Sequence, residues 1–204
     1  MNLRRNLPAT AVALALLLPA IAAAETLHFP VDPTHSEVAF KVRHLVAKVP
    51  GRFDAFSGNV WADPENVAGT LRIEGSIDVG SVNINNEKRD GHLLSADFFD
   101  AENHPTMTFV SKSVKAHGDV YQVTGDFTMR GVTKEVTLVA DIAGFATNPF
   151  TSTQTTGLEI TGAIDRKEIG MVWNKDLDTG GVILGEKVHL SIQIEATVPP
   201  AETG

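Results

Sequence analysis

Apolar and polar residues alternate along most of the chain with a period of two. The clearest example is 71–79, where Leu71, Ile73, Ile77 and Val79 share one face and polar side chains share the other. Such alternation predicts β-strands with one buried and one solvated face. Clusters of Gly, Pro and Asp separate the runs, and short links of this kind favour antiparallel neighbours. Comparable runs cover residues 37–43, 121–129, 136–142, 158–165 and 188–198.

The lengths of these runs favour a barrel over a sandwich. Several are on the order of ten residues, and long strands are typical of an up-and-down barrel, here of about eight strands. Gly58, Gly75, Gly125 and Gly162 lie within the strands at apolar positions. A glycine there lets a strand coil sharply and also leaves space inside the barrel. We expect curvature to be the main role of these glycines, and the two roles are compatible.

The segment 87–104 interrupts the alternation with a charged, helix-like stretch. Asn85 or Asn86 can cap a short helix at its start. Leu94 and Phe98 lie four residues apart and can face the same way on such a segment. A short amphipathic insert between two strands of a barrel fits naturally across the open end. We therefore expect it to cover the mouth.

The start of the chain has the pattern of a secretory signal peptide. Arg4 and Arg5 precede an apolar run too short for a comfortable membrane span, and three alanines then end at Ala24. We expect cleavage there, which leaves residues 25–204 as a single barrel domain with no stable membrane span. The alternative is an uncleaved N-terminal anchor.

The composition of the chain narrows the classes of function and of partner that it can have. The 204 residues contain no cysteine, which excludes disulfides and thiolate metal ligands. The formal net charge of −8 disfavours nucleic acid and anionic membranes as electrostatic partners. A hydrophobic content of 43% supports a core large enough to hold the fold by burial alone.

Five segments of the chain resemble the YceI-like family. They are "DPTHSEVAFKVRHL", "GRFDAFSGNV", "NEKRDGHLLSADFFDAENHPTMTF", "GDFTMRGVTKEV" and "IDRKEIGMVWN" with the following "GGVILGEKVHLSIQIEA". The resemblance covers essentially all of the expected mature chain, in order and with matching spacing. It implies a lipocalin-like antiparallel barrel, a periplasmic location and a polyisoprenoid or isoprenoid-quinone ligand. A fatty acid or fatty amide is the alternative cargo.

Inward positions in the strand pattern supply the candidate ligand contacts, and each of them could instead only pack the core. The candidates for the lumen are Phe40, Val42, Ile73, Ile77, Phe109, Phe127, Met129, Leu138, Ile160, Ile164, Val188, Leu190 and Ile192. The candidates for the mouth, where a ligand headgroup would lie, are His44, Ser81, Asn83, Arg89, Leu94, Phe98 and Phe99.

Other classes of function have weaker support in the sequence. The nearest approach to a metal cluster is His92, Asp97, Asp100, Glu102 and His104, whose spacing matches no ligand pattern. No G-x-S-x-G nucleophile motif is present, although paired carboxylates stay open for a hydrolase. A structural barrel with a filled core is a third alternative. We expect a binding protein that is not an enzyme and has no catalytic residue, metal or cofactor. The sequence leaves open whether it forms a homodimer.

Overall fold

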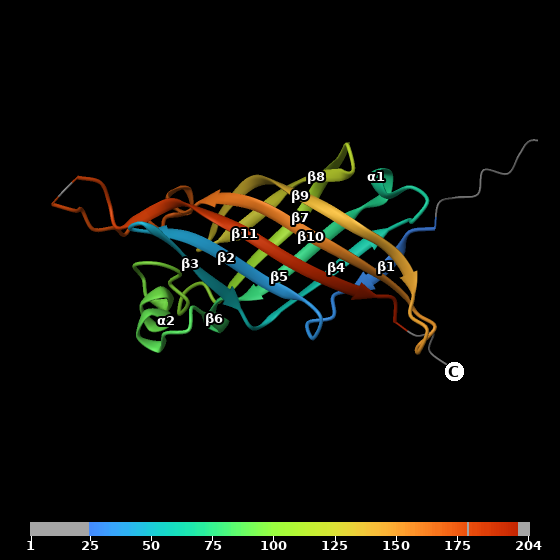
Figure 1. The fold of residues 1–204 in the computed structure, drawn as a ribbon, viewed down its shortest axis with the longest axis horizontal. Coiled ribbons are helices and arrows are strands. Elements are labelled where there is room, and N and C mark those ends of the chain that lie inside the picture. Colours follow the sequence, from blue (N-terminus) through green and yellow to red (C-terminus); the bar gives the residue numbers. More distant parts are fainter. Residues whose placement is uncertain (1–24, 179, 200–204) are drawn as a thin grey trace, which may run out of the picture.

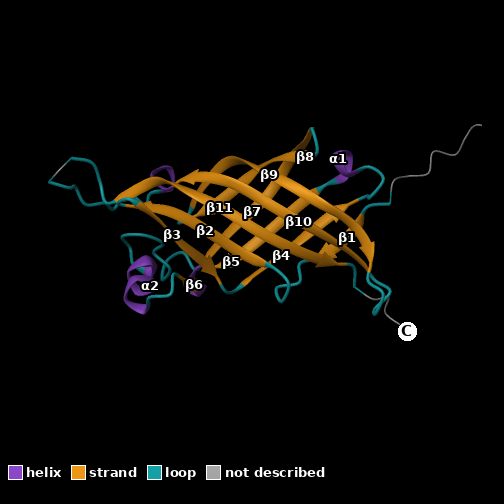
Figure 2. Cartoon of the chain, in the orientation of Figure 1, coloured by secondary structure: helices purple, strands orange, loops and turns teal. Residues whose placement is uncertain are grey.

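The computed structural model describes residues 25–178 and 180–199 (Figure 1). The expected signal peptide, residues 1–24, lies outside this part of the chain. The described residues form one antiparallel sheet with few helices (Figure 2). Its strands are β1 (Leu27–Pro30), β2 (Glu37–His44), β3 (Ala47–Phe53), β4 (Phe56–Ala62), β5 (Arg72–Asp78), β6 (Val82–Asn83), β7 (Thr106–His117), β8 (Val120–Met129), β9 (Val132–Thr147), β10 (Gln154–Asp165) and β11 (Leu184–Thr197). Its helical segments are α1 (Val67–Thr70), α2 (Glu87–Leu94) and the 3₁₀ turns η1 (Val79–Ser81) and η2 (Arg166–Ile169).

The sheet curls into a barrel. The strand order is β1-β4-β5-β7-β8-β9-β10-β11-β2-β3-β6, with every pairing antiparallel. Val31, next to β1, bridges to Ala196 in β11, and the amide of Asp32 donates to the carbonyl of Glu195 at 2.8 Å. The fold class expected from the sequence is confirmed. The described sheet has 11 strands rather than about eight, because short strands such as the four-residue β1 and the two-residue β6 complete its edges.

Sequence alternation matches burial along the strands. On β8 the inward Val123 and Met129 are buried, and on β2 Val38 and Phe40 are buried while Glu37 and Lys41 are exposed. Turn chemistry sets the register between β8 and β9. There, Arg130-Gly131 has φ of +52° and +70°, the left-handed pair that a tight hairpin requires.

The inward glycines do not all have the same role. A Cβ on Gly125 would lie 2.5 Å from the carbonyl oxygen of Val110, and a Cβ on Gly58 or Gly162 would also come closer than 3.0 Å to a neighbour. At these positions glycine permits the close approach of packed groups. A Cβ on Gly75 would meet nothing within 4 Å, so this glycine leaves open space.

Two clusters of buried side chains fill different parts of the barrel. One packs beneath α2 and the segment that follows it, and the other lies toward the opposite end, where β1 closes the sheet. The first cluster includes Phe40, Phe53, Val79, Val82, Phe98, Phe99, Met107, Ile164 and Ile169. The second includes Phe29, Val60, Ala62, Leu71, Val123, Ala140, Leu158 and Ala196.

The segment 87–104, which interrupts the alternation, folds as expected. The side chain of Asn86 caps α2 by accepting from the amide of Arg89 at 3.1 Å. After the helix, the hydroxyl of Ser95 donates back to the carbonyl of His92, and the chain continues in turns. These turns bury Phe98 and Phe99 in the first cluster. The segment therefore covers one end of the barrel, at the lower left in Figure 1.

Candidate ligand-binding cavity

The barrel encloses a cavity of about 330 Å³. This volume falls at the lower end of the range of roughly 300–1,000 Å³ in which proteins hold small molecules. Strands supply most of the wall, and the segment after β6 together with the loop after η2 supplies the cover. Apolar side chains and glycine form nearly all of the lining. The exceptions are His44, Ser57, Glu74, Ser76, Arg89, His92, Thr108 and Arg166.

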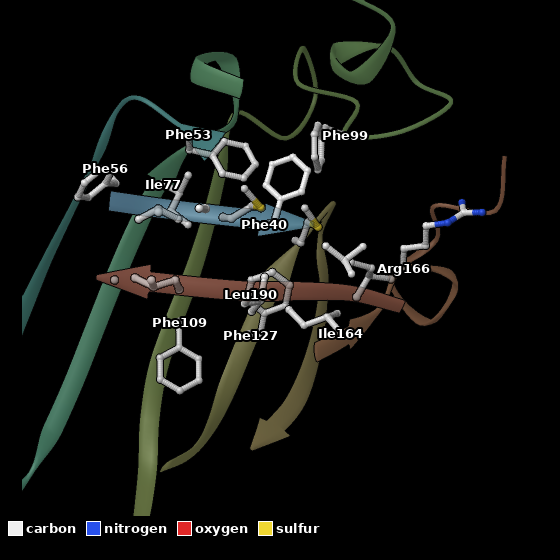
Figure 3. A pocket seen from close by; sticks show the side chains of 18 of the residues that line it. Phe40, Phe53, Phe56, Ile77, Phe99, Phe109, Phe127, Ile164, Arg166 and Leu190 are labelled. Atoms are coloured by element: carbon white, nitrogen blue, oxygen red, sulfur yellow. The ribbon is translucent and has the colours of Figure 1, made fainter. Parts of the chain in front are cut away.

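Every residue predicted for the lumen lies along this cavity. The alternation of β2, β5, β7, β8, β9, β10 and β11 directs these side chains inward from all sides of the barrel. Figure 3 labels Phe109, Phe127 and Leu190 among the side chains that line the cavity. That a ligand contacts them stays a prediction. The thirteen are Phe40, Val42, Ile73, Ile77, Phe109, Phe127, Met129, Leu138, Ile160, Ile164, Val188, Leu190 and Ile192.

Aromatic rings form the wall closest to the cover. The rings of Phe40 and Phe53 have centroids 5.5 Å apart, and Phe53 meets Phe99 edge to face at 5.7 Å (Figure 3). Such pairs gain attraction beyond the area they bury. Phe40 comes from β2, Phe53 from β3 and Phe99 from the covering segment, so this contact joins the wall to the cover.

The residues predicted for the mouth separate into two groups. His44, Arg89, Phe98 and Phe99 line the cavity. Leu94 packs against the first buried cluster without lining the cavity.

Ser81 and Asn83 also lie away from the cavity lining, contrary to the prediction from alternation. The 3₁₀ turn η1 ends at Ser81 and directly precedes β6, which contains Asn83, so it interrupts the period of two and changes the direction of both side chains. The hydroxyl of Ser81 donates to the carbonyl of Asp78 at 2.6 Å. The amide of Asn83 donates to the carboxylate of Asp54 at 2.9 Å.

Several lining residues were not among the predicted ones. Met107 continues the inward alternation of Phe109, and that pattern could have identified it. Phe53 and His92 also line the cavity. Trp173 lines the cavity from the loop that follows η2. No periodic pattern indicates its direction, because residues 171–175 belong to no strand or helix.

A three-ring contact joins the two parts of the cover. The ring of His92 on α2 meets Phe98 and Trp173 edge to face, at 5.0 Å and 5.1 Å between centroids. Phe98 and Trp173 lie 5.2 Å apart. The carboxylate of Asp97 lies 3.1 Å from Nε2 of His92, so this interaction also helps to hold the imidazole ring in place. The contact ties the α2 segment to the loop that follows η2.

Two arginines anchor the backbone of the cover. Nη1 of Arg130 donates to the carbonyls of Ala96 and Phe98. Arg166 is 2% exposed and donates from Nε to the carbonyl of Gly185 at 2.9 Å and from Nη1 to that of Trp173 at 2.8 Å. Figure 3 shows its guanidinium directed away from the cavity, so its stem lines the wall and its charge holds the loop.

Burial of Arg166 has an electrostatic consequence. Desolvation lowers the pKa of its guanidinium from the ordinary value, while the nearby carboxylates of Glu186 and Asp165 raise it. Nη2 has no hydrogen-bond partner among the described residues. The carbonyls of Gly185, Met171 and Trp173, which accept from Nε and Nη1, offset part of the cost of burying the cation.

The acids and histidines of the insert do not converge on a common point. His92 pairs with Asp97, and His104 lies 3.8 Å from Asp100. Within residues 25–178 and 180–199, the metal-ligating groups that do converge are Asp32, His35 and Glu195.

That second group lies at the other end of the barrel. Nδ1 of His35 is 2.7 Å from the carboxylate of Asp32 and 3.9 Å from that of Glu195. Hydrogen bonds from Thr34 and His35 lower the pKa of Asp32 to about 2. Hydrogen bonding to Asp32 raises the pKa of His35. The geometry is that of an exposed ion pair.

An antiparallel barrel with a covered, apolar interior defines the lipocalin-like class. A model of the YceI-like domain matches residues 29–196, and the chain belongs to this family. A UPF0312 protein of Staphylococcus aureus strain USA300 is 38% identical over 172 residues, which cover 84% of this chain and 98% of that protein. No helix in the described ranges is long and apolar enough to cross a bilayer.

Solved structures show the same fold. Burkholderia cenocepacia BcnA superposes with a TM-score of 0.71 and 26% identity, covering 81% of this chain and 99% of its own. A polyisoprenoid binding domain from Saccharophagus degradans superposes with a TM-score of 0.63 and 16% identity, covering 85% of this chain and 99% of its own. At that identity, the second comparison speaks for the fold alone.

Proposed function

We propose that this protein binds a long apolar chain of the polyisoprenoid or isoprenoid-quinone type inside its barrel and carries or sequesters it. One observation carries the proposal: the barrel holds a cavity with an almost wholly apolar lining, drawn from nine strands and the cover. Membership of the YceI-like family, whose resemblance implies a polyisoprenoid or isoprenoid-quinone ligand, supports this choice of cargo. A fatty acid or fatty amide is the alternative.

Burial alone supplies enough free energy for such a ligand if its chain is long. Each buried methylene contributes about 0.8 kcal/mol, so about ten carbons give roughly 8 kcal/mol and about twenty give roughly 15 kcal/mol. Association costs roughly 4–15 kcal/mol. A short chain would therefore bind marginally, whereas a long one would bind well with few polar contacts. This balance favours an isoprenoid of several units over a short acyl chain.

The mouth supplies the polar contacts. His44 and Arg89 line the cavity at its covered end and are exposed to solvent. Their position suits a headgroup that remains in water while the apolar chain enters the barrel. We expect Arg89→Gln to weaken a prenyl phosphate more than the matching prenyl alcohol, because only the phosphate gains from the guanidinium charge.

Export is part of the proposal. A signal sequence over residues 1–24 would deliver the domain to the periplasm, where a water-insoluble chain needs a carrier between membranes. Amino-terminal sequencing of the exported protein is expected to begin at Glu25. A protein that retains Met1 in the envelope would instead be anchored there.

Mass spectrometry tests the cargo directly. The protein is purified from its exported form without detergent, extracted with organic solvent and analysed for lipids. A stoichiometric isoprenoid supports the proposal, and a stoichiometric fatty acid or amide supports the alternative cargo. A protein that carries no lipid and takes up no added prenol would be a structural barrel. Turnover of an ester substrate would identify a hydrolase, and either result would overturn the binding proposal.

A further inference from the structure

Large apolar side chains are exposed around the mouth of the barrel. Val46 is 95% exposed, Val172 66%, Leu45 44% and Val182 42%. We call these four residues the mouth patch. Leu45 and Val46 form the turn between β2 and β3, and the other two lie in the loop between η2 and β11. In Figure 1 both segments project from the left end of the barrel.

Backbone pairing holds the two parts of the mouth patch together. The amide of Leu45 donates to the carbonyl of Ile183 at 2.8 Å. His44 pairs with Leu184 in the register of β2 and β11. The β2–β3 turn therefore lies beside Val182 and forms one surface with it.

The mouth patch continues the lining of the cavity. His44 lines the cavity and precedes Leu45, and Ile183 lines it and follows Val182. Val172 lies between Met171 and Trp173, both of which line the cavity. The mouth patch therefore lies at the rim of the cavity.

The turn formed by Leu45 and Val46 has a sequence that folding by itself would not favour. Leu45 has φ of +54°, a conformation that asparagine and glycine adopt more easily than leucine. Two-residue hairpin turns favour Asn-Gly, which also keeps the turn polar. Leu45 and Val46 lack the backbone preference of Asn-Gly for this turn, and they also expose apolar side chains to water, since neither is buried. Strain of this kind together with exposed apolar surface points to a role in binding.

Basic residues flank the turn. Arg43 and Lys48 are exposed cross-strand partners directly behind it. Neither pairs with a carboxylate in the described ranges. An apolar tip with basic flanks fits the boundary between lipid headgroups and acyl chains, where the apolar side chains insert and the cations meet phosphate.

The acidic balance of the whole chain does not oppose this local attraction. Charges farther away than a Debye length of about 10 Å are largely screened. At the same end, Asp176 and Asp178 lie in the loop with Lys175, which limits the electrostatic gain. Insertion of apolar side chains is therefore the main source of affinity, and the basic pair adds to it on anionic lipid.

We infer that the mouth patch seats the barrel on a lipid bilayer, so that the apolar chain passes between membrane and cavity without crossing water. The inference rests on the proposed function, because the bilayer is the reservoir of such a chain. Four side chains on a projecting tip are too few for the roughly 1,200–2,000 Å² of a stable protein interface. A fluid lipid surface needs only shallow insertion.

Vesicle flotation tests the inference with the mature protein, purified after export. The vesicles contain phosphatidylcholine alone or with about 30% phosphatidylglycerol. Leu45→Asn with Val46→Asp is expected to lower the bound fraction about tenfold or more on both. Arg43→Gln with Lys48→Gln is expected to lower the bound fraction about fivefold for each charge removed, and only on the vesicles that contain phosphatidylglycerol.

Phe150→Asp is the matched control. Phe150 is 95% exposed, like Val46, and lies in the turn between β9 and β10 at the opposite end of the barrel. Its substitution should leave vesicle binding unchanged. Equal loss in this variant, or full binding by the Leu45→Asn and Val46→Asp variant, would overturn the inference. If the Leu45→Asn and Val46→Asp variant lost a dimer that the wild type forms, and vesicle binding did not change, the inference would also be overturned. The mouth patch would then join two copies of the chain.

Uptake separates this inference from the proposed function. The Leu45→Asn and Val46→Asp variant should still bind a prenol added from ethanol, while its uptake from vesicles slows about tenfold or more. Normal uptake from vesicles would argue against the seat on the bilayer. A wild-type protein that binds vesicles and no prenol would refute the cavity's function and leave the membrane contact standing.

Discussion

The imidazole ring of His92 meets the indole ring of Trp173 edge to face, with 5.1 Å between the ring centroids. These two residues belong to the two segments that cover the mouth, and the contact closes the gap between them. A ligand that enters at this end must pass the cover. The strength of this contact should therefore influence how fast cargo leaves.

Trp173→Ala is expected to speed the release of a bound apolar chain, because it removes the ring that both His92 and Phe98 contact. Stability should fall by about 2 kcal/mol, since the residue is only half-buried. Release of a fluorescent prenol to excess acceptor, measured by stopped flow, checks the rate. Trp61→Ala serves as control, because Trp61 stacks on His28 and Arg72 away from the cavity. Similar acceleration in both variants would mean that general loosening is the cause.

Gly75→Leu should reduce the uptake of long chains while the protein stays folded. A side chain at this position extends into open space beside the cavity and meets no atom at its Cβ. Gly125→Ala should behave in the opposite way and destabilise by about 1–3 kcal/mol, because the new methyl would lie 2.5 Å from the carbonyl of Val110. Prenol titration and urea unfolding of both variants measure the two effects. Undiminished capacity in folded Gly75→Leu would contradict binding at that level of the barrel.

Arg166→Met should lower stability by roughly 2–4 kcal/mol, because carbonyls of Trp173 and Gly185 lose their donor in a buried site. The loop after η2 should also exchange its amide hydrogens faster. Urea unfolding and hydrogen exchange measure these changes. Lys167→Met is the neighbouring control, since its exposed pair with Glu186 contributes at most about 1 kcal/mol. Equal effects at the two positions would show that Arg166 does not anchor the loop.

The ion pair of Asp32 and His35 should give the stability a pH dependence. The folded-state pKa of His35 is raised, so its contribution is complete below the ordinary value of 6.5 and disappears as the pH rises through the folded value. The pKa of Asp32 is lowered to about 2, so its contribution is present above 3.8 and disappears as the pH falls toward 2. The pair therefore stabilises most in mildly acidic solution. His35→Gln should lower the Tm more near pH 5 than near pH 8. If thermal melts showed the same loss of Tm at both pH values, the ion pair would not be the source of the pH dependence.

The predictable part of the fold is the part that repeats. Alternation placed Phe127, Ile164 and Leu190 correctly inside the barrel, because side-chain direction in a strand depends only on parity. It failed at Ser81 and Asn83, where a 3₁₀ turn of three residues changes that direction.

The cover could be predicted only as a location. Asn86 and the break in alternation indicated the short helix, since capping is a local property of the sequence. The meeting of His92 with Trp173 depends on tertiary packing between segments about eighty residues apart, and so does the path of Arg166 to its carbonyls. Neither has a signal in the local sequence. Which glycine leaves space also depends on neighbours across the sheet, as Gly75 and Gly125 show.

The second buried cluster, around Phe29 and Leu158, fills the closed end of the barrel; six of its eleven buried residues stay clear of the cavity and five line it. The six that stay clear of the cavity stabilise the barrel without touching a guest. Substitutions near the cover can then alter which guest is accepted while these six residues preserve the architecture. Such a division leaves the chain free to change its cargo through a few substitutions, without rebuilding the scaffold that holds it.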